Sequence, residues 1–112
     1  MVKKKGSVPR PVKTSEFVIQ LATIGAEGGW RDICATQKNA VADAWDRLTK
    51  TPLQSDTKCH QLKGELATFD RAGIKHARWQ YELTGGARIW FYVEGRTVNI
   101  VEVFTHHPNQ TK

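Results

Sequence analysis

The sequence predicts an α+β fold, in which a small antiparallel sheet carries two helices packed on one face. Residues 76–107 contain three consecutive runs rich in β-branched and aromatic side chains, separated by glycine-containing turns. Residues 30–50 instead repeat their apolar side chains with the period of a helix. An antiparallel sheet with helices on one face leaves its other face open, and we expect the functional side chains there.

A single domain is expected, because 112 residues suffice for one hydrophobic core but not for two. We assign residues 16–112 to this domain and residues 1–15 to a basic, flexible leader without a periodic apolar pattern. The net charge of +6 favours a polyanionic partner or an acidic protein. Cys34 and Cys59 occur singly, which indicates two reduced thiols. No apolar run is long enough to span a bilayer, so we expect a cytoplasmic protein without membrane contacts.

The first half of the chain predicts one strand followed by two helices. Residues 16–22 form a short apolar strand. Three glycines then interrupt regular structure, namely Gly25, Gly28 and Gly29. The second helix has the clearer apolar stripe, which consists of Val41, Ala44, Trp45 and Leu48. We expect a break between the helices near residues 36–39, where capping residues cluster, and an end at Pro52.

The second half predicts a loop and then a three-stranded meander. Residues 53–74 show no sustained period, which indicates a loop with one short strand. Residues 76–83 are a better strand, closed by the glycine pair at 85–86. The terminal hairpin follows over residues 87–107, and Pro108 ends its last strand because proline cannot donate to a sheet.

The turn of the terminal hairpin decides which side chains share a face. A two-residue turn at residues 94–95 places Arg88 on the same face as His107, whereas a three-residue turn places it with Glu102 and His106. The first register segregates the apolar side chains more cleanly, and we favour it. Its buried face consists of Ile89, Phe91, Val98 and Ile100. Its open face carries Arg88, Trp90 and Tyr92.

Three motifs occur in order along this pattern. They are Leu62-Lys63-Gly64 before the meander, Arg88 at the start of the first hairpin strand, and the final strand ending in His106-His107. With the order of elements and the basic charge, they make the chain similar to the RelE/ParE superfamily of small toxins from bacterial toxin–antitoxin systems. The resemblance to its RelE-like branch implies a toxin that cuts mRNA in the ribosomal A site without a metal. It also implies a cognate antitoxin that wraps the toxin's surface.

The resemblance implies four catalytic positions. Arg88 matches the sheet arginine of the family, His106 or His107 matches the catalytic position at the end of the last strand, and Glu65 is similar to an acidic residue near the Leu-x-Gly stretch. Metal-free cleavage of RNA needs a base, an acid and cations that stabilise charge on the phosphate. Histidine titrates near neutrality and suits the proton transfers. The predicted RNA-binding residues are Lys63, Arg78, Trp79, Tyr81, Trp90 and Tyr92.

Other interpretations of the same residues stay open. The alternating aromatic side chains also suit ordinary sheet packing, and Arg78 and Arg88 also suit cross-strand pairs with glutamate. The pairs Cys59-His60 and His106-His107 match no known ligand spacing, so we expect neither a metal nor another cofactor. Two alternative functions remain: a ParE-like inhibitor of DNA gyrase, and a non-catalytic protein of the same fold that binds RNA or the ribosome.

Overall fold

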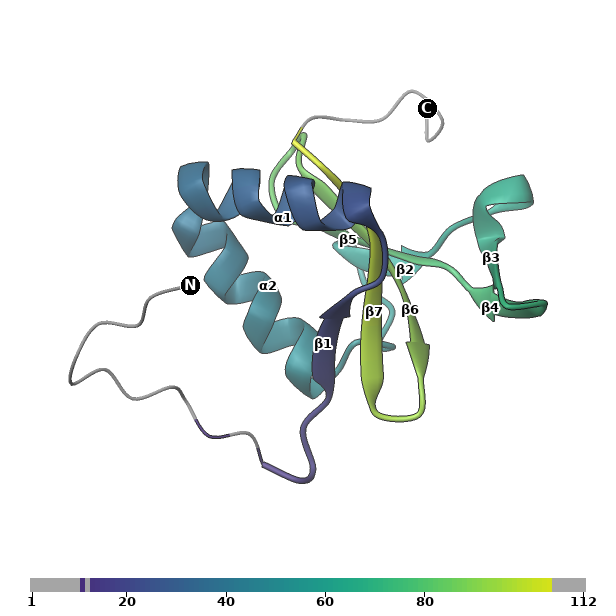
Figure 1. The fold of residues 1–112 in the computed structure, drawn as a ribbon. Helices are drawn as coiled ribbons and strands as arrows, with labels where there is room; N and C mark the ends of the chain where they lie inside the picture. Colours follow the sequence, from purple (N-terminus) through teal and green to yellow (C-terminus); the bar gives the residue numbers. More distant parts are fainter. Residues whose placement is uncertain (1–10, 12, 106–112) are drawn as a thin grey trace.

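Two helices lie on one face of a five-stranded sheet, and a separate two-stranded hairpin projects from the sheet (Figure 1). These elements come from residues 11 and 13–105, which are the residues described by this computed structural model. In chain order the elements are β1 (Val18–Leu21), α1 (Ile24–Thr36), α2 (Lys38–Lys50), β2 (Cys59–Gln61), the 3₁₀ helix η1 (Gly64–Ala67), β3 (Thr68–Arg71), β4 (Ile74–Ala77), β5 (Trp79–Glu82), β6 (Arg88–Glu94) and β7 (Thr97–Phe104). The predicted α+β class with two helices is confirmed.

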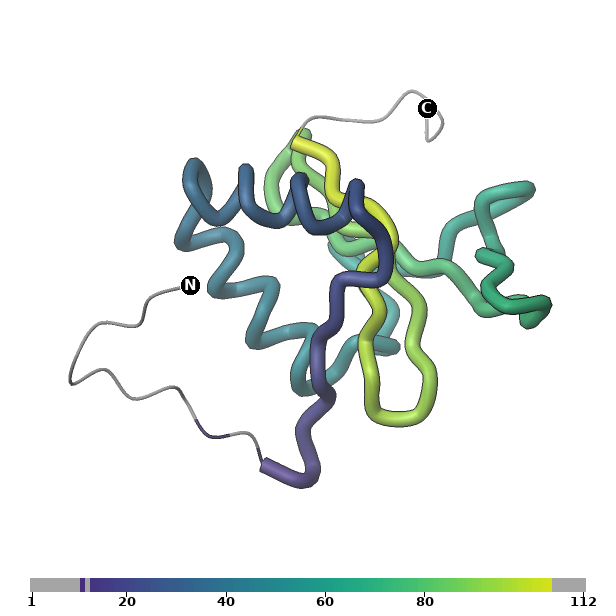
Figure 2. The backbone as a smooth tube through the Cα atoms, viewed as in Figure 1, coloured from purple at the N-terminus to yellow at the C-terminus, as the bar shows by residue number. Residues whose placement is uncertain are grey.

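The sheet is mixed, which corrects the prediction of a wholly antiparallel sheet. Its strand order is β1-β7-β6-β5-β2, and β1 runs parallel to β7 while the other neighbours are antiparallel. Parallel neighbours need a long connection between them. The chain provides it, because α1 and α2 carry it from β1 to the opposite edge, where β2 lies (Figure 2).

Helix α1 begins at Ile24, earlier than the sequence predicts. The hydroxyl of Thr23 caps the helix by accepting a hydrogen bond from the backbone N–H of Ala26 at 2.9 Å. The helix contains the three glycines that were expected to interrupt it, Gly25, Gly28 and Gly29. That expectation is wrong because the cap starts the helix before them and because α1 packs closely on β7. The predicted break near residues 36–39 is confirmed at Gln37.

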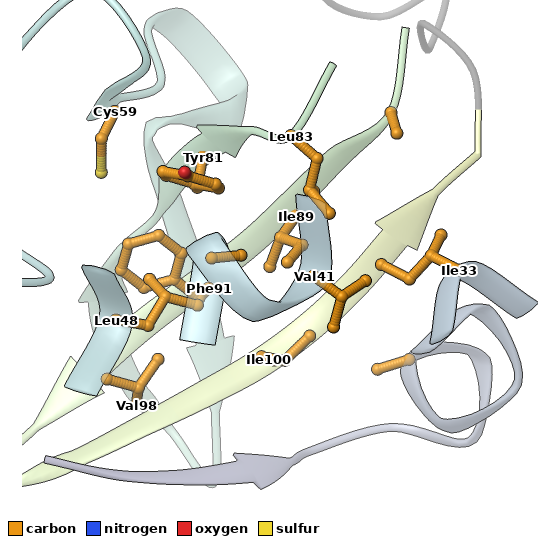
Figure 3. Close-up of a cluster of buried hydrophobic side chains, with 13 residues drawn as sticks. Ile33, Val41, Leu48, Cys59, Tyr81, Leu83, Ile89, Phe91, Val98 and Ile100 are labelled. Carbon is orange, nitrogen blue, oxygen red and sulfur yellow. The ribbon is translucent and has the colours of Figure 1, made fainter. Parts of the chain in front are cut away.

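The main core lies between the two helices and the sheet, where β-strand alternation and helical periodicity bring apolar side chains together (Figure 3). The predicted buried face of the hairpin is confirmed, since Ile89, Phe91, Val98 and Ile100 are all fully buried in this core. Val41, Ala44 and Leu48 of α2 cover them, as the helical stripe predicts. Trp45 lies at the edge of the stripe and is 38% exposed.

The turn of the β6–β7 hairpin consists of residues 95–96, one residue later than predicted. Gly95 adopts φ +61°, the left-handed conformation that a two-residue hairpin turn requires at its first central position. Glu94 therefore pairs with Thr97. The favoured turn at residues 94–95 is wrong because it needs a positive φ at Glu94, whereas Gly95 adopts the positive φ.

A β-bulge at Val101 shifts the register further along the same hairpin. Because Val101 has no partner in the ladder, Arg88 pairs with Phe104 and shares its face with Glu102. The favoured register places Val103 on the same face as Arg88. In the structure Val103 instead packs against the main core. The face shared with Glu102 is the one that the three-residue alternative predicts.

The face of the sheet opposite to the helices, here called the second face, is covered and not open. Trp90 and Tyr92 lie on it as predicted but are only 3% and 2% exposed. The cover comes from residues 62–77, which were expected to form mainly a loop and instead form η1 and the β3–β4 hairpin. The predicted strand 76–83 is split at Arg78, whose backbone N–H donates to the carbonyl of Ala67 at 2.8 Å.

Gly29 lets α1 lie directly on β7. A Cβ added there would stand 2.6 Å from the carbonyl oxygen of Val103 and 2.8 Å from its Cβ, which is too close for real atoms. Gly28, its neighbour in the same helix, would meet nothing within 4 Å. The two glycines therefore differ in packing while sharing the same helical backbone.

We expect Gly29→Ala to destabilise the fold by about 1–3 kcal/mol, because the extra methyl group overpacks the contact between α1 and β7. Gly28→Ala is the matched control and should instead stabilise the fold by roughly 0.5–1 kcal/mol through its better helix propensity. Urea denaturation of both variants measures the two free energies of unfolding. Shifts of the same sign would contradict the close approach of α1 to β7.

Candidate functional site

Arg88, the arginine that the resemblance implies to be catalytic, lies in a buried ion pair. It is 7% exposed, and its Nη1 lies 3.1 Å from Oε1 of Glu82, its cross-strand partner. Its Nη2 donates a hydrogen bond to the carbonyl of Gly85 at 3.2 Å. These two contacts of the guanidinium stabilise the connection between β5 and β6. The other predicted catalytic residues at the chain end, His106 and His107, lie outside the described residues.

The remaining predicted residues divide between the surface and the helix side. Lys63 and Glu65 are exposed around the start of η1. Trp79 packs against the main core, and Tyr81 is buried in it, where burial raises the pKa of its phenol. A nucleic-acid base does not reach Tyr81 there. Cys59 is buried in the same core and burial raises its pKa to about 11, so its thiol stays protonated and unreactive.

Arg78 lies on the second face between two aromatic rings. Its guanidinium carbon is 5.3 Å from the ring centroids of both Phe69 and Trp90, within the range of cation–π attraction. Its Nη2 donates to the carbonyl of Thr68 at 2.9 Å, while its buried Nε has no hydrogen-bond partner among the described residues. Burial lowers the pKa of Arg78 and the carboxylate of Glu102 opposes this effect. The side chain nevertheless stays a cation at neutral pH.

Tyr92 holds the β3–β4 hairpin against the sheet. The ring of His76 stacks on Tyr92 with centroids 4.2 Å apart, and Phe69 stacks on it at 5.7 Å. Phe69 and His76 are cross-strand partners, so the hairpin presents two rings to one tyrosine. Nη1 of Arg71 donates to the tyrosine hydroxyl at 3.2 Å. The hairpin thereby places a guanidinium beside an imidazole.

A hollow of about 290 Å³ lies between the hairpin and the second face. It is lined by Gln20, Arg71, Ala72, Ile74, His76, Tyr92, Glu94 and Asn99. The register aligns Gln20, Asn99 and Tyr92 in one row across β1, β7 and β6, and this row forms the floor. The hollow thus combines a cation, a carboxylate, a titratable ring and two amides, a mixture typical of sites for polar ligands.

The hollow contains residues that the sequence pattern does not single out, notably Arg71, His76 and Asn99. The signal that could have found the first two is the Ala72-Gly73 pair, which forms the turn between β3 and β4. Both turn residues have positive φ, +53° and +80°, as a two-residue hairpin requires. A hairpin at that turn would have placed Arg71 and His76 on one short structure.

Cations and carboxylates are mixed around the β3–β4 hairpin and η1. Lys63, Arg71 and Lys75 are exposed, and Arg78 is half-buried beside them. The carboxylates there are Glu65, Asp70, Glu94 and Glu102. Among the described residues, no group of three or more histidine, cysteine or acidic side chains is placed to hold a metal. No helix in the described part of the chain is long and apolar enough to cross a membrane.

Comparisons with known proteins give no match. No family model matches the chain, and neither a curated protein nor a solved structure does. The resemblance to the RelE/ParE superfamily stays a prediction from the motifs of the sequence. The candidate site rests on the geometry of the second face.

We expect Arg88→Ala to lower the free energy of unfolding by about 1–3 kcal/mol, because it empties a buried position and removes the partner of Glu82. Arg31→Ala is the control, since its side chain is 74% exposed and its ion pair with Glu27 spans 3.7 Å. That change should stay within roughly 0.5 kcal/mol. Chemical denaturation measures the free energy of unfolding of both variants. An Arg88→Ala variant as stable as the parent would contradict a structural role for the ion pair between Arg88 and Glu82.

Proposed function

We propose that the chain is a RelE-like toxin that cuts ribosome-bound mRNA by metal-free acid/base chemistry. In this proposal the RNA binds where the β3–β4 hairpin meets the second face of the sheet, and a cognate antitoxin neutralises the protein. The observation that carries the proposal is that His76 stacks on the ring of Tyr92 while Arg71 donates to the hydroxyl of the same tyrosine, at the edge of a hollow. An imidazole next to a guanidinium supplies a proton-transfer group and a phosphate ligand together.

Charge and aromatic content support RNA as the substrate. Single-stranded nucleic acids bind to basic grooves in which aromatic rings and arginine planes stack against bases. The second face offers exposed Arg71, with Arg78 between two rings, while Lys63 lies at the start of η1 and Lys75 on the other side of the β3–β4 hairpin. The net charge of +6 adds long-range attraction to the polyanionic ribosome. Each feature alone also suits packing, and of these cations only Arg71 lines the hollow.

The proposed chemistry uses a general base and a cation. His76 removes the proton of a ribose 2′-OH, the 2′-oxygen forms a bond to the adjacent phosphorus, and the bond from phosphorus to the 5′-oxygen breaks. Arg71 stabilises the negative charge that grows on the phosphate oxygens. An acid must protonate the leaving 5′-oxygen. His106 and His107, implied by the resemblance, are the candidates for this second proton transfer.

We expect expression of the chain without its antitoxin to arrest growth by stopping translation, because cleaved mRNA no longer supports protein synthesis. Pulse labelling measures the order of events, and incorporation of amino acids should fall before incorporation of thymidine. DNA synthesis falling first would favour a gyrase inhibitor. Arrested translation with intact mRNA would favour a binding protein without nuclease activity.

His76→Phe should lower the rate of mRNA cleavage by roughly 10²–10⁴-fold, because phenylalanine keeps the ring stacked on Tyr92 but cannot transfer a proton. His60→Phe is the matched control, since His60 lies in β2 and does not line the hollow. Cleavage is measured by primer extension on mRNA in a translation extract. A fully active His76→Phe variant beside an inactive His106→Ala/His107→Ala variant would move the chemistry to the chain end.

A further inference from the structure

We propose that the hollow between the β3–β4 hairpin and the sheet is a pocket for one guanine nucleotide, in which Arg71 binds the phosphate and Glu94 the base. This deepens the proposed function, on which it rests for the source of the nucleotide, by naming the base next to the cleaved bond. It assigns roles to three polar side chains that the cleavage chemistry leaves unused, namely Gln20, Glu94 and Asn99.

Three polar side chains that line the hollow have no partner in the part of the chain that the structure describes. Among the described residues, the side chains of Gln20, Glu94 and Asn99 make no hydrogen bond or ion pair. Asn99 is the most notable, because it is only 6% exposed and sits in the middle of the floor. Its amide is not among the fully buried side-chain atoms that lack a partner, because it reaches the hollow. An amide that faces a hollow is available to a ligand.

The size and the walls of the hollow suit a nucleotide. Its volume of about 290 Å³ is near the lower end of small-molecule sites, which span about 300–1,000 Å³. Exposed Ile74 gives one wall an apolar surface for a flat base or a ribose. Arg71, on the hairpin side, presents the donors that bind phosphate oxygens. Glu94 adds a carboxylate two residues beyond Tyr92 on the floor strand.

The carboxylate selects guanine among the four bases. An ionised glutamate only accepts hydrogen bonds, and it binds best to two neighbouring donors. The pairing edge of guanine offers such donors in its N1–H and its 2-amino group, whereas those of adenine, cytosine and uracil each mix one donor group with acceptors. The amides of Gln20 and Asn99 can donate to the remaining acceptor, O6. Each donor and acceptor on the pairing edge of guanine therefore has a complementary side chain in the hollow.

Titration of the full-length protein with nucleoside monophosphates tests the pocket without any cleavage. Guanosine 5′-monophosphate should bind about tenfold or more tightly than inosine 5′-monophosphate, which lacks only the 2-amino group that bonds to a charged acceptor. Adenosine 5′-monophosphate should bind no more tightly than the inosine nucleotide. The side-chain amide signals of Asn99 should shift in NMR spectra on addition of the guanosine nucleotide.

Two variants test recognition of the base and binding of the phosphate separately. Glu94→Gln should abolish the preference for guanosine over inosine monophosphate, and Glu27→Gln, an exposed change on α1, should leave it intact. Arg71→Ala should weaken the binding of both nucleotides by a similar factor. Both sites are exposed, so the variants should remain folded, and circular dichroism checks this.

The outcomes for the pocket and for the proposed function are distinct. Equal affinities for the three nucleotides, or no binding of any of them, would overturn the pocket even if the protein cuts mRNA. Selective binding of the guanosine nucleotide that requires Glu94 would support the pocket even if no cleavage is found. In that case only the proposed nuclease activity would be lost.

Discussion

The stacking of two hairpin rings on Tyr92 is the contact on which the second face depends. It adds to the backbone attachment near Arg78 and to the contacts of the Arg78 side chain with Thr68, Phe69 and Trp90. Aromatic pairs of this kind contribute roughly 0.5–1.5 kcal/mol beyond the area they bury. The same contact orients Arg71 through the tyrosine hydroxyl. Stability and the geometry of the candidate site are therefore linked at one side chain.

Much of the helix side of the fold could be predicted from the sequence, because periodicity reports which side chains are buried. The alternation of Ile89, Phe91, Val98 and Ile100 predicts one face of the sheet, and the spacing of Val41, Ala44 and Leu48 predicts the helix above it. The parallel pairing of β1 could not be predicted in this way. Strand direction depends on where the chain crosses the sheet, and no local pattern encodes it.

The second face could be predicted only in part, for two physical reasons. The bulge at Val101 shifts the alternation of β7 by one residue, so that Val103 and not Glu102 follows Ile100 on the core face, and strict alternation gives the wrong partner for Arg88. The hollow also draws on β1, β6, β7 and the β3–β4 hairpin, and its formation depends on how the hairpin folds back. The short strands of that hairpin have four residues each, too few for a clear period.

Arg78 makes the hairpin and the sheet parts of one mechanical unit. Its N–H donates to the carbonyl of Ala67 beside the hairpin, and its carbonyl accepts from the N–H of Leu62 beside β2. The base of the hairpin is thus fixed by two backbone hydrogen bonds, while its tip at Ala72-Gly73 is exposed. Local opening starts where backbone contacts are fewest. The hairpin is therefore held at two places, by these backbone hydrogen bonds at its base and by the contacts of Arg71 and His76 with Tyr92 nearer its tip.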